Sequence, residues 1–304
     1  MFKRLLGSLG AGGPTVDTVL PAWTAAPGGT VSGQVHLRGG SGDFDIEHIT
    51  LELVAGDEVF DRFVVGGGFR LVAGAEHSVP FTVTLPWETP ITELYGQDLG
   101  ITLGVRTELA VAGGKDTGDL DRLAVGPLPV QEAILEAFGR LGFGFTSADL
   151  EYGHIGGTGQ RLPFYQEIDL APAPQYAYAL YELEVAFLAA PDGMEVVLEA
   201  DKHRGHDTLT RFTVSHDEVR HQDWTSVVDG WMRELTARCE HWHSFSDDYA
   251  DTGPGMGTAV AAGAAGLAVG VVGGMVAAEV VDEVGDFFEG DDEDDEGDDE
   301  SGED

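Results

Sequence analysis

The sequence predicts a mainly β protein made of two antiparallel β-sandwich domains, each followed by a helix. Short stretches of alternating apolar and polar residues recur through the chain, as where Ile49, Leu51 and Leu53 alternate with Thr50 and Glu52. Clusters of glycine and proline separate these stretches, as expected for turns between strands. Only two segments carry the period of an amphipathic helix, so helices are additions to a β framework.

The first sandwich is predicted over residues 1–128. Strand-like alternation covers residues 31–37, 46–53, 79–85 and 101–111, with turn formers between them. Many short strands at this spacing are typical of an antiparallel sandwich.

The first ten residues place Lys3 and Arg4 beside apolar side chains, as a signal peptide does. Glycines break the apolar run early, so we expect a short amphipathic turn that packs on the body. The single cysteine, Cys239, excludes an internal disulfide framework and fits a reducing compartment. We therefore expect a cytoplasmic protein, with peripheral contact at the membrane as the alternative.

A bridging helix opens the second domain, which is predicted over residues 129–246. Pro129 suits the first turn of this helix and Gly142 suits its end. The apolar residues of the segment fall on one helical face: Val130, Ile134, Leu135, Phe138 and Leu141.

A second β series follows, with strand-like stretches at residues 162–170, 176–188, 194–200 and 209–215. Ser215 offers an N-cap side chain, and a closing helix is predicted at about 222–239.

Beyond residue 246 the composition changes. Residues 247–278 are rich in glycine, alanine and valine, and residues 279–304 form an acidic tail of low complexity that we expect to be disordered. Small residues recur every four positions in the first segment, which on a helix makes one continuous groove. The members of this predicted helix-association groove are Ala262, Gly266, Gly270, Gly274 and Ala278.

Three interpretations of residues 256–278 remain open. The segment is a helix that self-associates or docks on a membrane or a partner, a membrane span, or a flexible linker. Its 23 uncharged residues reach the length of a span. Its glycines weaken a helix, and the preceding acidic residues do not favour insertion.

The charge of the chain is strongly negative. Asp and Glu number 54 against 16 Lys and Arg, a net charge of −38. The segment 279–304 holds 16 of the acidic residues and no basic one, so the body still carries −22. Nucleic acid is excluded as a partner because binding its phosphates needs a basic surface. Other proteins are the expected partners.

The sequence contains no convincing catalytic motif. Cys239, His241 and His243 lack the paired spacing of a structural zinc site. The glycine loop at 153–159 leads into a strand rather than a helix, so it forms no phosphate cradle. The acidic residues at 116–121 lie in what reads as an exposed turn. We expect no enzyme activity, no catalytic residue, no metal site and no cofactor.

Several segments, in order, resemble the bacterial sporulation-control protein family (stage-zero sporulation protein M). The most similar pieces are Lys3–Gly10 with Val16–Leu20, Pro27-Gly28-Gly29-Thr30-Val31, the stretches 46–53 and 79–90, Leu162-Pro163-Phe164-Tyr165-Gln166-Glu167, and the stretches 183–187 and 193–201. The resemblance covers roughly residues 1–240. It implies an arrestin-like fold of two β-sandwich domains.

Three hypotheses of function follow. The resemblance implies a non-enzymatic, arrestin-like adaptor that regulates sporulation or cell development through protein–protein contacts. The alternative is a membrane-associated structural protein assembled through the groove at 262–278. A hydrolase or metalloenzyme on a sandwich scaffold is disfavoured, because no catalytic constellation is present.

Overall fold

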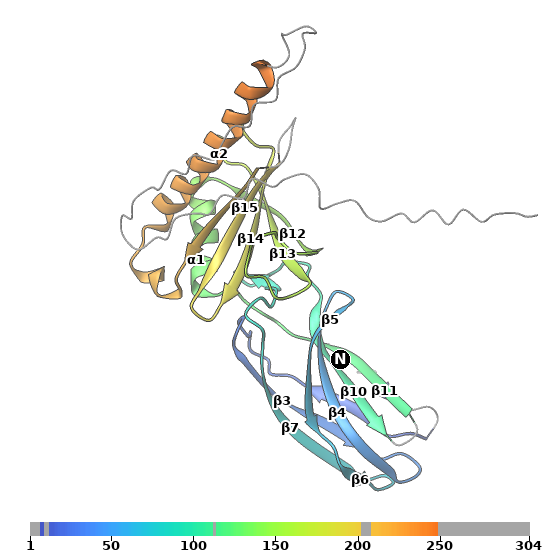
Figure 1. Cartoon of the computed structure of the whole chain (residues 1–304). Helices are drawn as coiled ribbons and strands as arrows, with labels where there is room; N and C mark the ends of the chain where they lie inside the picture. The colour runs from blue at the N-terminus through green and yellow to red at the C-terminus, as the bar shows by residue number, and fades with distance from the viewer. Residues whose placement is uncertain (1–6, 9–11, 112–113, 202–207, 249–304) are drawn as a thin grey trace, which may run out of the picture.

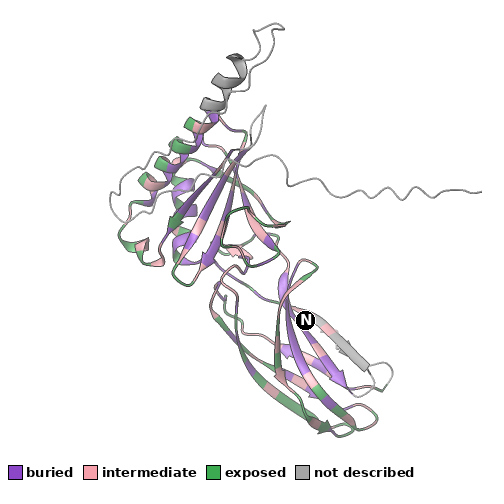
Figure 2. Ribbon diagram, in the orientation of Figure 1, coloured by how far each residue is buried: buried purple, intermediate pink, exposed green. Residues whose placement is uncertain are grey.

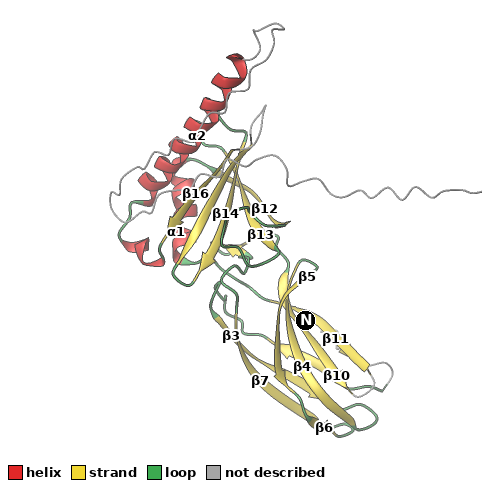
Figure 3. Cartoon of the chain, viewed as in Figure 1, coloured by secondary structure: helices red, strands yellow, loops and turns green. Residues whose placement is uncertain are grey.

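The molecule consists of two β-rich units joined end to end (Figure 1). This computed structural model describes residues 7–8, 12–111, 114–201 and 208–248. Strands predominate, all the sheets are antiparallel, and two α-helices accompany them (Figure 3). The predicted mainly β class with two helices is confirmed.

The first unit is a sandwich of two sheets. One sheet has the strand order β1-β2-β3-β7, and the other has the order β11-β10-β4-β5 with β6 paired to β4. The first sheet contains β1 (Gly7–Ser8), β2 (Thr15–Val19), β3 (Thr30–Arg38) and β7 (Glu76–Thr84). The second contains β4 (Phe44–Ala55), β5 (Glu58–Gly66), β6 (Phe69–Leu71), β10 (Leu103–Val111) and β11 (Gly114–Arg122).

Alternating apolar residues close this sandwich. In β3, Val31, Val35 and Leu37 are buried, because every second side chain faces the opposite sheet. The hydroxyls of Thr18 in β2 and Thr107 in β10 lie 2.6 Å apart in the buried layer and share a hydrogen bond. This bond satisfies two polar groups that would otherwise destabilise the core.

The acidic residues at 116–121, which the sequence predicts to lie in an exposed turn, lie instead in a strand, so that prediction was wrong. Strand β11 pairs with β10 from Gly114, opposite Val111, to Arg122, opposite Gly104. It forms the edge of its sheet, where polar residues are tolerated and discourage pairing with other chains. Its sequence therefore lacks the apolar alternation that reveals a more deeply buried strand.

A small hairpin of β8 (Glu93–Leu94) and β9 (Gln97–Asp98) precedes β10. The chain then enters α1 (Pro129–Leu141), which begins and ends as the sequence predicts. Pro129 occupies the first turn, and Gly142 takes a left-handed conformation with φ of 96°. The Gln131 side chain accepts a hydrogen bond from the backbone N–H of Leu128 at 2.7 Å.

The second unit is one five-stranded sheet in the order β12-β13-β14-β15-β16, packed on two helices. Its strands are β12 (Gly144–Tyr152), β13 (Phe164–Ala171), β14 (Glu182–Ala190), β15 (Gly193–Asp201) and β16 (Thr208–Val214). Helices α1 and α2 (Trp224–Asp248) lie together on one face of the sheet (Figure 3). In this unit, therefore, helices supply the layer that faces the sheet.

Apolar side chains on both sides of this contact explain the helical layer. Trp231 of α2 stacks on Phe212 of β16, with ring centroids 4.6 Å apart. Val228 and Leu235 are also fully buried, one turn to either side of Trp231. Figure 2 shows the buried residues lining the inner side of the helices and the sheet.

The closing helix starts close to the predicted position and runs further than predicted, from Trp224 to Asp248. Ser215 does not cap it. Ser215 caps a separate 3₁₀ turn, η1 (His216–Arg220), where its hydroxyl accepts from the backbone of Asp217 and Glu218 returns a bond to Ser215. None of the helices in the described part is long and apolar enough to cross a membrane.

Side-chain to backbone hydrogen bonds at Glu88 and Gln166 join the units. The Glu88 carboxylate accepts hydrogen bonds from the backbone N–H groups of Arg161 and Leu162, each at 2.9 Å. The side-chain amide of Gln166 accepts from the backbone N–H of Ile91 at 2.9 Å and donates to its carbonyl at 2.8 Å. In each case a side chain of one unit forms hydrogen bonds with the backbone of the other unit.

Aromatic contacts complete the junction. Phe164 of β13 is buried and meets Phe60 of β5 edge to face, with ring centroids 5.6 Å apart. Trp87 stacks on His216 of η1 at 5.2 Å. A β carbon added at Gly28 would meet the Trp87 ring at 2.5 Å, so Gly28 lies directly against the indole. The two units therefore share a continuous apolar core.

Candidate functional site

The face of the second sheet that points away from the helices carries a row of carboxylates. Asp169, Glu184 and Glu199 lie directly opposite one another on β13, β14 and β15. Like charges in directly opposed positions destabilise a sheet. This arrangement therefore costs stability, which makes the face a candidate functional site.

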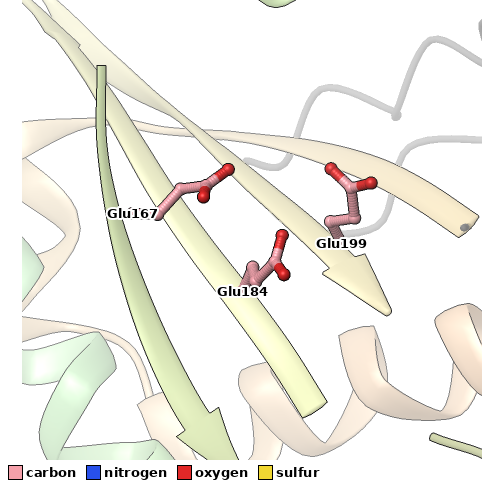
Figure 4. Close-up of side chains that lie close together, drawn as sticks. All are labelled: Glu167, Glu184 and Glu199. Atoms are coloured by element: carbon pink, nitrogen blue, oxygen red, sulfur yellow. The ribbon is translucent and has the colours of Figure 1, made fainter. Parts of the chain in front are cut away.

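Glu167, two residues before Asp169, completes a tight acidic cluster with Glu184 and Glu199. One carboxylate oxygen of each residue lies within 4.8 Å of the other two. Figure 4 shows the three side chains rising from adjacent strands toward one another. All three are half-buried. We call Glu167, Glu184 and Glu199 the acidic triad.

Burial raises the pKa of the Glu167 carboxyl to about 8 from its ordinary value of 4.5, and neighbouring negative charges add to the rise. Those charges belong to Glu184, Glu151, Glu199 and Asp169. Burial, followed by the charge of Glu167, also raises the pKa of the adjacent Tyr165 hydroxyl. Glu167 is therefore protonated at neutral pH, which relieves part of the repulsion in the triad.

The protonation of Glu167 makes stability depend on pH. The folded chain holds this proton up to about pH 8, whereas the unfolded chain loses it near pH 4.5. Folded stability therefore falls as the pH rises from about 4.5 to about 8. Glu167→Gln removes this loss. We expect it to raise the free energy of unfolding at pH 8.5 by about 1–2 kcal/mol, since solvent screens part of the repulsion.

Urea unfolding of both proteins at pH 4 and pH 8.5 measures this effect. Glu76→Gln, at an exposed carboxylate of β7, is the control and should leave the unfolding midpoints unchanged. Equal midpoints of Glu167→Gln and the unmodified protein at pH 8.5 would contradict the prediction.

The triad has limited chemical capacity. Three carboxylates this close can share a proton. With one oxygen each, they supply three of the six to eight oxygen ligands that Ca²⁺ takes. The triad alone is therefore not a complete metal site.

A pocket of about 510 Å³ lies at the junction of the two units. The loop after β7 contributes Trp87 and Glu88, and the second unit contributes the ends of β14, β15 and β16 with the segment around Arg161. Volumes of this order accommodate small molecules or a few residues of a peptide. We call this cavity the junction pocket.

Some charged groups of the junction pocket are already hydrogen-bonded within the protein, and others are not. The Glu88 carboxylate is already bound by two backbone N–H groups. The carboxylates of Asp192 and Glu195 and the guanidinium of Arg161 have no partner among the described residues. Glu195 is half-buried, whereas Asp192 and Arg161 are exposed. The pocket therefore presents charges that are free to meet a ligand.

The predicted helix-association groove, Ala262, Gly266, Gly270, Gly274 and Ala278, lies outside the described residues, as does the acidic tail. Of the Cys/His group, Cys239 is buried in α2 with its thiol toward the core. The acidic triad and the junction pocket were missed by the sequence analysis. Glutamates at alternating positions of strand-like stretches are visible in the sequence, but which of them meet depends on strand order and register.

Comparison with known proteins gives three concordant similarities. A protein-family model described as SpoOM protein matches residues 2–204. The sporulation-control protein spo0M of Bacillus subtilis (strain 168) is 39% identical over 214 residues, which make up 66% of this chain and 80% of that protein. The crystal structure of Spo0M, sporulation control protein, from B. subtilis matches with a TM-score of 0.64 and 33% identity, covering 74% of this chain and 98% of that one. The resemblance seen in the sequence is confirmed.

Proposed function

Because this chain belongs to the family of Spo0M sporulation-control proteins, we propose that it acts in sporulation control as a non-enzymatic adaptor that binds a partner protein. The observation that supports this best is the junction pocket, a cavity that both units form. The charged side chains of Asp192, Glu195 and Arg161 in its lining have no partner among the described residues. A partner seated there contacts both units at once.

The lining of the pocket supports binding rather than catalysis. Besides its carboxylates and Ser215, the lining includes no histidine, cysteine or lysine among the described residues, so it contains no serine–histidine or cysteine–histidine pair. Its free charges are carboxylates and one guanidinium at the rim of an apolar cavity. Such a composition suits recognition of a complementary side chain.

The alternative, a membrane-associated structural protein, depends on residues 256–278, which lie outside the described part of the chain. No observation on the described residues favours it over the adaptor. We therefore place the interaction at the body of the protein, and we expect a cytoplasmic location.

A complementation experiment tests the adaptor function. We expect this chain, expressed in B. subtilis that lacks its own Spo0M, to restore the count of heat-resistant spores. Glu195→Lys reverses a charge of the junction pocket and should abolish the restoration, while circular dichroism shows that the variant is folded. Glu76→Lys, on the exposed surface of the first unit, should restore spores like the unmodified chain.

Two outcomes would count against the proposal. A spore count that stays at the level of the deletion strain when the unmodified chain is expressed argues against a role in sporulation control. Full restoration by Glu195→Lys argues against the junction pocket as the partner site.

A further inference from the structure

We propose that the junction pocket receives a single lysine or arginine side chain of the partner protein. This inference rests on the proposed function, since it takes the partner to be a protein, and it specifies the chemistry by which that partner is recognised.

The interior of the pocket fits the apolar stem of such a side chain. Buried apolar residues from separate segments line it: Leu162, Leu188, Met194 and Val214. Lysine and arginine bury their methylene groups against apolar surface and leave the charged head at a polar edge. A cavity with an apolar interior and a charged rim matches this division.

The rim supplies the complementary charge. Asp192 and Glu195 have carboxylates without partners among the described residues, and Glu88 adds a third negative charge. A cation placed near Glu195 gains a charge-assisted hydrogen bond to this half-buried carboxylate. The net charge of −22 on the body attracts basic partners over a longer range.

Arg161 limits the number of charges that the pocket accepts. Its guanidinium lies exposed in the same lining and has no carboxylate partner among the described residues. It repels a second cation and can donate to a carbonyl oxygen of the incoming backbone. The pocket therefore suits one basic residue in an otherwise uncharged stretch.

Other ligand classes fit less well. The Trp87 ring already stacks on His216 and lies directly against Gly28, which disfavours the stacking of a flat aromatic ligand on the indole. An anionic ligand is disfavoured, because the pocket lining contains three carboxylates and only one guanidinium. The pocket carboxylates also do not converge as a metal site requires; among the described residues only the acidic triad does.

Fluorine NMR of the full chain labelled with 5-fluorotryptophan tests the proposal, because Trp87 lines the pocket. The probes are Nα-acetyl-lysine methylamide, its norleucine analogue and its glutamate analogue. We expect the lysine amide to shift the Trp87 resonance saturably with a dissociation constant on the order of 1 mM, as for small ligands of this size. The norleucine and glutamate amides should bind at least ~10-fold more weakly, because neither carries the cation.

Matched variants locate the interaction. Glu195→Gln should weaken binding of the lysine amide by about 5-fold, with Asp192→Asn as a second rim variant, since each removes one charge–charge contact. Glu76→Gln should leave binding unchanged. The proposal is overturned by equal binding of the norleucine amide, by tighter binding of the glutamate amide, by unchanged binding in both rim variants, or by the absence of any saturable shift.

The two proposals fail in different ways. Restored spores without a shift by the lysine amide would leave the adaptor function standing and overturn the ligand class alone. A saturable shift without restored spores would leave the pocket chemistry standing and overturn the role in sporulation control.

Discussion

Replacing Phe164 with alanine is expected to lower the free energy of unfolding by about 3–5 kcal/mol, the usual cost of removing a buried phenylalanine. Phe164 is 1% exposed, and its ring contacts Phe60 of the first unit and Tyr152 of the second. The substitution therefore leaves a cavity at the junction itself. Both units lose packing at the same time.

Urea unfolding followed by far-ultraviolet circular dichroism measures this loss. Phe145→Ala is the matched control, because Phe145 belongs to the same sheet and is 50% exposed. The control should change the unfolding free energy by less than about 1 kcal/mol. Similar effects of the two substitutions would show that Phe164 contributes no more than a surface aromatic residue does.

Replacing Gly28 with alanine is expected to lower the free energy of unfolding by about 2–5 kcal/mol. Gly28 has a φ of +70°, which disfavours any residue with a β carbon by about 1–2 kcal/mol. The added β carbon would also meet the Trp87 ring at 2.5 Å, and overpacking of this kind costs about 1–3 kcal/mol. Trp87 must then shift from its stack on His216, which disturbs the wall of the junction pocket.

Gly68 provides a control that separates the two causes. Its φ of +71° is nearly the same, but nothing lies within 4 Å of an added β carbon. Gly68→Ala should therefore show the backbone cost alone, and the difference between the two variants measures the contact with Trp87. If both variants lose equal stability, the close approach of Gly28 to the indole does not contribute.

Local patterns in the sequence were sufficient for much of the fold. The alternation in residues 31–37 predicts β3, and Pro129 and Gly142 mark both ends of α1, because these signals act within a few residues. Strand β11 escaped prediction because an edge strand does not need the apolar alternation of a buried one. The helical layer of the second unit escaped because a single sequence does not say which element covers which face.

The candidate site could not be predicted for a related reason. Glu167, Glu184 and Glu199 are separated by 15 or more residues in the chain. They meet only because β13, β14 and β15 are neighbours in one particular register. The junction pocket is harder still to predict from the sequence. Its walls come from both units, so its shape depends on the relative orientation of the two units.

The hydrogen bonds at the junction constrain the residue type at some positions and not at others. Glu88 binds backbone N–H groups at positions 161 and 162, and Gln166 binds the backbone of Ile91. Any residue except proline supplies the same N–H group, so substitutions at the backbone positions preserve these bonds, whereas substitutions of Glu88 or Gln166 do not. Relatives can therefore diverge at position 161, which lines the junction pocket, while keeping the hydrogen bonds that join the two units.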